Sequence, residues 1–329
     1  MNRLHGAIDR LPGPAWLAYA VATALLVLLA IWSDQLVVPS TLLQPTAYSA
    51  VIALFPLALI QYLDGVARRG LRNFRPALSL SDPEVDRLSY ELTTMPRGAA
   101  RVVSLVGVGI AILGLLVSPE EMLGPAEMPI VLSIVGFGGV LFGYMSFALL
   151  FYHTIRQLRL VSLIHSRAAS VNLFQPQPLY AFSTLTLRTA VALVLLSYYI
   201  VAVSSGVSMG PATVGLLGVN LSLSVALFTL PLYGMHIRLR EEKNRQLSAV
   251  SGRIEAVLSS LHRALEDPVA GQIDTLNKGL ASLMVERDLI VRSPTWPWTP
   301  GTVRAFASSA LLPIALWLIT RVLESSLGR

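Results

Sequence analysis

The sequence predicts an all-α protein, a polytopic transmembrane helical bundle of about seven spans with a cytoplasmic helical hairpin before the last span. Only 13% of its 329 residues are charged and 54% are hydrophobic, whereas ordinary soluble domains carry about 25% charged residues. The hydrophobic residues gather in blocks of roughly 20, the length that a helix needs to cross about 30 Å of hydrocarbon. Lys and Arg lie between alternate blocks, as the positive-inside rule expects.

The apolar blocks set the expected spans. A cleaved signal peptide is the competing interpretation of the first block, but no small-residue cleavage site follows Trp32. Pro56 lies inside the second block, where neighbouring helices can satisfy the backbone groups that a proline leaves free. The last block is short, so six spans with a re-entrant or interfacial last helix is the alternative. The expected spans are residues 15–32, 46–62, 102–117, 129–152, 189–207 and 212–235, followed by a last helix within 301–329.

The basic residues predict the orientation of the chain. With the N-terminus in the cytoplasm, 23 of the 25 Lys and Arg residues fall on the cytoplasmic side. The predicted outer loops, residues 33–45, 118–128 and 208–211, contain no Lys or Arg. This partition is typical of a protein in the inner (cytoplasmic) membrane of a cell, and a seventh crossing would leave the C-terminus outside. Membrane topology therefore explains the net charge of +6, and we expect no nucleic-acid binding.

Two basic cytoplasmic loops are expected, residues 65–100 and 153–188. A helix start is predicted at Ser81-Asp82-Pro83-Glu84, because proline and acidic residues favour a first turn. The first loop also begins with an amphipathic stretch around Leu71 and Phe74, which is either a topology anchor or a site for anionic lipids. The arginines of this interfacial stretch are Arg68, Arg69, Arg72 and Arg75.

The segment 236–300 is predicted to form the cytoplasmic helical hairpin. Apolar residues recur every three or four positions from Leu247 to Ala264, which is a heptad seam typical of a coiled coil. Asp267-Pro268 ends this helix, and a second apolar stripe runs from Ile273 to Ile290. The two stripes can pack on each other, on the segment after the fourth span, or on another subunit. Trp296 and Trp298 follow between prolines and are expected at the level of the lipid headgroups.

Few residues in the spans could carry chemistry. Asp64 and His153 fall at cytoplasmic span ends, and no charged residue lies in the middle of the other spans. Since a charge at the bilayer centre costs at least about 3 kcal/mol, this pattern argues against proton-coupled transport, voltage sensing and aspartyl intramembrane proteolysis. The chain has no cysteine and no HxxxH, so we predict no enzyme activity, cofactor or metal site. His153 and His236 are interpreted as interfacial histidines, with a pH-sensing pair as the alternative.

Uncharged polar residues inside the spans form either interhelical hydrogen bonds or a narrow polar pathway or ligand pocket. Gly139 and Gly143 form a GxxxG pair, which predicts close helix packing with a helix of the same or another chain. The candidate pathway or pocket residues are Asn220, Ser222, Ser224, Ser197, Tyr198, Ser308 and Ser309.

Two stretches of the sequence have recognisable motifs. One is Asn172-Leu173-Phe174 through Pro178 to Ser183; the other comprises Glu286-Arg287, Thr295-Trp296-Pro297-Trp298, Pro300-Gly301-Thr302, Arg304, Phe306, Leu311-Leu312-Pro313-Ile314 and Trp317. These stretches resemble recurring pieces of uncharacterised prokaryotic multi-pass membrane proteins. They cover less than a fifth of the chain, and the resemblance implies a shared fold but no activity. The predicted layout also resembles that of insect odorant-receptor channels, in architecture alone, which is weak support for a function.

These observations favour a non-enzymatic membrane protein. The first expectation is an oligomeric, channel-like or ligand-responsive protein that assembles from copies of itself through its cytoplasmic helices. One alternative is a signalling or scaffold subunit with a cytoplasmic protein partner, and another is a carrier for an uncharged or amphiphilic solute. In each case the lipid bilayer, including its anionic lipids, is an expected partner.

Overall fold

The structure is a computed structural model. The described residues are helical apart from short turns and connections, and they include no strand, which confirms the all-α class. Three helices among them are long and apolar enough to cross a membrane: Asp82–Val117, Gly136–Ser166 and Leu217–Glu266. This number is smaller than the seven spans predicted, and much of the predicted first and last spans lies outside the described residues. The structure describes residues 18–19, 21–25, 28, 43–117, 119, 130–166, 173, 178–203, 211–266 and 272–311.

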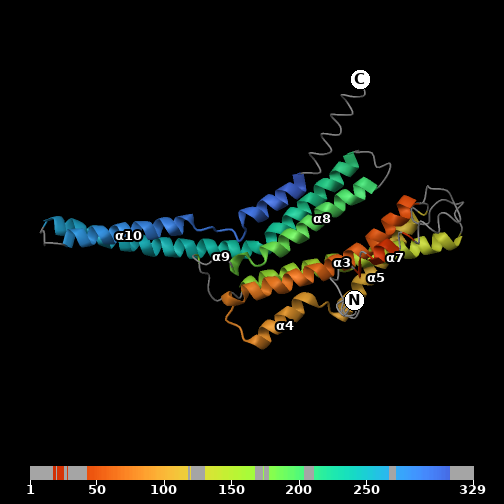
Figure 1. Cartoon of the computed structure of the whole chain (residues 1–329), viewed down its shortest axis with the longest axis horizontal. Coiled ribbons are helices and arrows are strands. Elements are labelled where there is room, and N and C mark those ends of the chain that lie inside the picture. The colour runs from red at the N-terminus through yellow and green to blue at the C-terminus, as the bar shows by residue number, and fades with distance from the viewer. Residues whose placement is uncertain are drawn as a thin grey trace, which may run out of the picture.

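Two groups of helices make up the body of the molecule (Figure 1). The first group contains α3 (Leu43–Phe74), α5 (Arg97–Val117) and α7 (Ile130–Ser166), with the short helix α4 (Asp82–Thr93) beside α3 and α7. The second group contains α8 (Ser183–Val203), the first half of α9 (Pro211–Glu266) and a helical stretch over 300–311. Short 3-10 turns lie at Arg75–Ala77 (η1) and Pro178–Tyr180 (η2). The two groups meet at one end and diverge from there (Figure 1).

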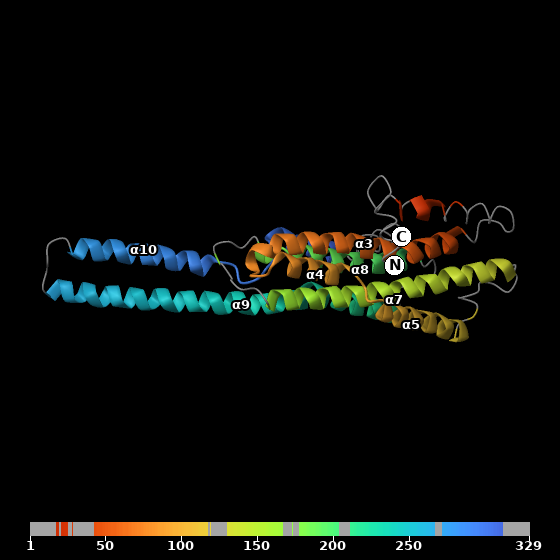
Figure 2. The ribbon, with the colours of Figure 1, turned by 90° about the horizontal axis from the view of Figure 1, so that it is seen from below.

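The second half of α9 and α10 (Gln272–Arg292) form an antiparallel hairpin that extends beyond both groups (Figures 1 and 2). The predicted seam residues of α9 are buried or half-buried, among them Val250 and Ile254, and so are Leu283 and Ile290 of α10. The two apolar stripes therefore pack on each other within one chain. The sequence left three possible partners for the seam open. In the structure the partner is α10 of the same chain.

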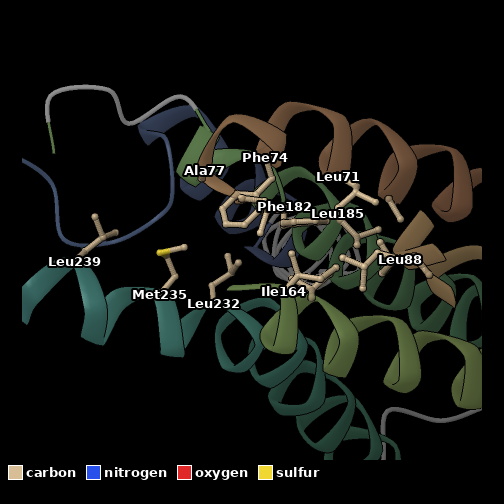
Figure 3. Close-up of a cluster of buried hydrophobic side chains, with 14 of the residues drawn as sticks. Leu71, Phe74, Ala77, Leu88, Ile164, Phe182, Leu185, Leu232, Met235 and Leu239 are labelled. Carbon is tan, nitrogen blue, oxygen red and sulfur yellow. The ribbon is translucent and has the colours of Figure 1, made fainter. Parts of the chain in front are cut away.

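The largest core lies where the two helix groups meet (Figure 3). Phe74 at the end of α3 and Phe182 before α8 are completely buried, and Leu232 and Met235 of α9 close the core from the other group. These residues lie at or beyond the predicted cytoplasmic ends of the spans. In contrast, the most apolar windows of the three candidate spans are only 11%, 33% and 22% buried. Such uncovered apolar helices are typical of a bilayer-facing surface, where lipid takes the place of a protein core.

A glycine brings two helices into close contact, at Gly107 of α5. A Cβ atom there would lie 2.7 Å from the Tyr144 carbonyl oxygen and 2.8 Å from Met145 Cα, so α5 and α7 touch backbone to backbone. A Cβ atom on Gly139 would meet nothing within 4 Å. Among the described residues, Gly139 therefore makes no close helix contact, although Gly143 of the same pair is buried. Glycine spacing alone could not predict which glycine faces a neighbouring helix.

The basic stretch at the end of α3 continues the straight helix of the second predicted span. Its apolar residues Leu71 and Phe74 lie in the protein core, so they do not form the lipid-facing side of an interfacial helix. Its arginines are exposed, as an anchor at the membrane edge requires. Arg75 pairs with Asp82 at the start of α4. The predicted start of that helix is confirmed, because Ser81 is its N-cap and forms a capping box with Glu84.

Candidate functional site

Most of the side chains predicted to line a polar pathway form hydrogen bonds within their own helices. A Ser hydroxyl can donate to the carbonyl oxygen one turn earlier in its own helix, and such a bond leaves less hydroxyl capacity for a solute. Tyr198 reaches a different helix, where its hydroxyl lies 3.3 Å from the Ala310 carbonyl oxygen. Ser308 is exposed, and the side-chain oxygen of Asn220 is buried without a hydrogen bond to the described residues. The local bonds run from Ser197 to Leu193, from Ser222 to Gly218, from Ser224 to Asn220 and from Ser309 to Phe306, at 2.7, 2.8, 2.9 and 2.8 Å.

A different set of residues, Asp64, His153 and Gln157, forms a buried polar cluster between α3 and α7. The Nε2 atom of His153 lies 2.7 Å from Oδ1 of Asp64, and the two residues are only 1% and 3% exposed. The Nε2 atom of Gln157 donates to the same carboxylate oxygen at 3.1 Å. The sequence places Asp64 and His153 at predicted span ends, but nothing in it predicts that they pair with each other.

Helical spacing explains why these polar residues point inward. Ile60, Asp64 and Ala67 are three and four residues apart, so they share the face of α3 that is buried in the bundle. His153 and Gln157 are four residues apart and share the facing side of α7. The same periodicity that builds the core therefore places a carboxylate opposite an imidazole.

The cluster is also connected to α4. The end of a helix leaves carbonyl groups without partners, and a cation is favourable there. Arg156 supplies both the hydrogen-bond donor and the positive charge. Its Nη1 atom donates to the carbonyl oxygens of Glu91 and Thr94 at 2.6 and 2.7 Å. Gln157 donates to the Leu92 carbonyl oxygen at 3.1 Å while it also binds Asp64. Neighbouring side chains of α7 thus hold the end of α4, and one of them belongs to the polar cluster.

The cluster brings a carboxylate, an imidazole and a carboxamide together on facing helices, joined by direct hydrogen bonds. Among the described residues, no three His, Cys, Asp or Glu side chains come together as metal ligands. Because burying an ionisable group is costly unless it is paired, a buried pair of this kind is a candidate functional site.

Trp296 and Trp298 belong to a column of five stacked rings. The column holds the chain after α10 against α9, because two of its rings come from α9 and the others from the returning segment. His236 Nδ1 lies 2.9 Å from the Thr295 carbonyl oxygen, so this nitrogen carries the hydrogen and donates it. In order, the rings are His236, Trp296, Trp298, Phe228 and Phe306, with centroids 3.9, 4.3, 4.9 and 4.6 Å apart and interplanar angles of 9° to 16°.

The ring column and the polar cluster therefore separate the two histidines that the sequence allowed as a pH-sensing pair. His153 binds Asp64, whereas His236 stacks on Trp296. Each histidine has its own partners.

Removing the central ring of the column should loosen the 300–311 stretch from α9. Trp298→Leu deletes two stacking contacts, each worth about 0.5–1.5 kcal/mol beyond the buried area. We expect the apparent unfolding temperature in mild detergent to fall by about 3 °C or more. Phe142→Leu, on an exposed position of α7, is the matched control and should leave that temperature unchanged. Equal effects of the two substitutions would show that the column contributes nothing to stability.

The fold defines the class of the protein, an all-helical protein with three helices that are long and apolar enough to cross a membrane. No family model, no curated protein and no solved structure matches the chain.

Proposed function

We propose that the protein spans the cytoplasmic membrane about seven times from a cytoplasmic N-terminus, and that it is a signalling or scaffold subunit. In this proposal the α9–α10 hairpin docks a cytoplasmic protein. The observation that carries the proposal is the continuity of α9, a single helix of 56 residues. At 1.5 Å per residue it is about 84 Å long, far more than the thickness of a bilayer. It therefore joins an apolar membrane segment directly to the projecting hairpin.

The hairpin is held closed by polar contacts as well as by its apolar seam. Lys243 of α9 donates to the carbonyl oxygens of Val291 and Ser293 at 2.6 and 2.9 Å, where it caps the end of α10. Arg253 of α9 lies 3.9 Å from Glu286 of α10. A hairpin closed in this way presents a fixed surface to a partner. Little conformational entropy is then lost on binding.

The outer side of α10 carries an apolar patch consisting of Met284, Val285 and Leu289. These side chains are 59%, 62% and 54% exposed. The predicted topology places them in water, where a group of exposed apolar residues is typical of a protein interaction site. The patch lies outside the seam, so it is available after the hairpin has closed.

The expected channel loses its main motivation in this structure, because the seam that would join its subunits is occupied by α10 of the same chain. The carrier loses support in a similar way. Most of the polar side chains proposed to line its path bond to carbonyl groups of their own helices. These observations rank the scaffold above both alternatives.

Photocrosslinking tests the docking proposal in cells. A photoreactive amino acid at Val285 should give an adduct of one defined mass that contains a cytoplasmic protein. The same amino acid at Glu255, an exposed position of α9 in the same hairpin, is the control and should give no such adduct. An adduct between two copies of this chain at Val285 would support the channel-like oligomer instead. The absence of any adduct at Val285 would contradict both proposals.

A further inference from the structure

We propose that Arg188 of α8 and Arg69 of α3 bind the headgroup phosphate of an anionic phospholipid at the cytoplasmic edge of the membrane. In this site the ring of Tyr62 holds the guanidinium group of Arg188 in place. The inference rests on the membrane topology of the proposed function, but it makes no use of the docking hairpin.

Arg188 lies over the ring of Tyr62, where α8 packs against α3. Its guanidinium carbon is 5.2 Å from the centre of the ring. A cation over the face of an aromatic ring is attracted by the negative face of the ring, which favours one position for the guanidinium group. The sequence predicts one span that ends at residue 62 and another that begins at residue 189. This contact brings those two predicted span ends to the same level.

Arg69 lies on the same side of α3 as Tyr62. The two residues are seven positions apart, which is about two turns and about 10 Å along the helix axis, and both are exposed. The neighbouring Gly70 is in tight contact with Phe182, because a Cβ atom on Gly70 would lie 3.0 Å from that ring. The start of α8 therefore lies beside Arg69, and Arg188 follows between one and two turns later. The two long arginine side chains can reach one headgroup between them.

The two arginines have no acidic partner. None of the ion pairs in the described part of the chain involves Arg69 or Arg188. Asp64 lies on the opposite side of α3, where it is buried against His153. A phosphate group would supply the missing negative charge. Arginine suits this ligand, because its planar guanidinium group can form two parallel hydrogen bonds to phosphate oxygens.

The surroundings of the arginines favour a lipid over a free phosphate ion. Leu195 lies seven residues after Arg188 on the same side of α8 and is 54% exposed. This apolar side chain lies on the membrane side of the arginine, where it can contact an acyl chain. Tyr62 is 47% exposed, and tyrosine is enriched at the level of lipid headgroups. The site therefore offers a cationic contact for the phosphate and an apolar surface for the chains.

Native mass spectrometry of the full-length chain in detergent tests this inference, with phosphatidylglycerol and phosphatidylcholine as the lipids. The first phosphatidylglycerol should bind at least about tenfold more tightly than phosphatidylcholine. Arg188→Gln and Arg69→Gln should each weaken the binding of phosphatidylglycerol about fivefold, the effect expected for one arginine at an anionic lipid surface. Since Arg69 is exposed, its replacement should leave the fold intact, and the test does not depend on Arg188→Gln alone.

Substitutions of Tyr62 distinguish a specific site from a general attraction between charges. Tyr62→Leu should weaken the binding of phosphatidylglycerol about threefold, because the guanidinium group loses its ring, whereas Tyr62→Phe should retain the affinity. Arg287→Gln is the matched control, because Arg287 is an exposed arginine on α10 in the projecting hairpin. This control should bind phosphatidylglycerol as tightly as the unmodified protein.

Equal affinity for the two lipids would overturn the proposal. An equal loss of affinity in Arg287→Gln would do the same, since it would assign the binding to net charge. Excess inorganic phosphate, added as its ammonium salt, should not displace the lipid, and displacement would show that the site takes a free phosphate ion instead. A detergent micelle has no cytoplasmic side, so these outcomes are separate from a failure of the proposed orientation.

Discussion

Valine at position 107 is expected to force α5 away from α7 and to destabilise the protein by about 3 kcal/mol. The atoms that a side chain would meet at Gly107 belong to the backbone of Tyr144 and Met145. Backbone atoms in the middle of a helix cannot move aside as a flexible side chain can, so the two helices must separate. The measurement is thermal unfolding of Gly107→Val in mild detergent, followed by the loss of helical circular dichroism.

Gly109→Val provides a closely matched control for that result. Gly109 lies in the same helix two residues away, and a Cβ atom there would meet nothing within 4 Å. The two substitutions add the same side chain to the same helix, so their difference reports packing alone. If Gly109→Val lowered the unfolding temperature as much as Gly107→Val, the close contact between α5 and α7 would be wrong.

The second large effect is expected from Phe182→Ala, with a loss of about 3–5 kcal/mol. Phe182 is completely buried in the core between the two helix groups (Figure 3). Its ring lies 5.6 Å from the ring of Phe74 and 5.3 Å from that of His165, centroid to centroid. Its removal leaves a cavity at the junction, because the helices around it are held by other contacts and cannot fully collapse.

Tyr90→Ala is the control for the Phe182 substitution. Tyr90 lies on α4 and is 66% exposed, so its removal deletes an aromatic ring without opening a cavity. We expect a change of less than about 0.5 kcal/mol in stability. Proteolysis should also become faster in Phe182→Ala, because the junction between the helix groups opens more often. A Phe182→Ala protein as stable as Tyr90→Ala would show that the junction is not the main core.

Local patterns in the sequence predicted the elements that depend on neighbouring residues. The helix start at Ser81 and Glu84 is such a case, because a capping box is formed by residues three apart. The helical course of 247–264 was predictable because its seam has a sharp period of three and four residues. The partner of that seam was not predictable, since an apolar stripe has the same appearance whether it meets its own chain or another.

The features of the structure that the sequence could not predict depend on contacts between residues far apart in the chain. Asp64 and His153 are 89 residues apart, and nothing in either local pattern indicates the other. The ring column is a further example, because it needs the segment after α10 to return along α9. The tryptophans were predicted for the headgroup region by their composition and proline flanks, but their stacking on His236 and Phe228 depends on that tertiary arrangement.

The structure places buried ionisable side chains at the ends of two predicted spans. An absence of charge in the middle of most predicted spans argued against proton chemistry, yet a buried carboxylate and imidazole meet where two of those spans end. The composition of the middle of a span therefore does not predict such a pair. The well-packed junction beside it, and not the apolar segments, holds the helix groups together.

The apolar helices are expected to cross a bilayer, and the hairpin is expected to lie in the cytoplasm. The chain has no cysteine, so single-cysteine variants can be labelled without any background. With a membrane-impermeant maleimide on intact cells, Glu121→Cys in a predicted outer loop should be labelled. Lys278→Cys on α10 should be labelled only after the membrane is permeabilised. Labelling of Lys278→Cys in intact cells would contradict the orientation, and the proposed cytoplasmic docking would be wrong with it.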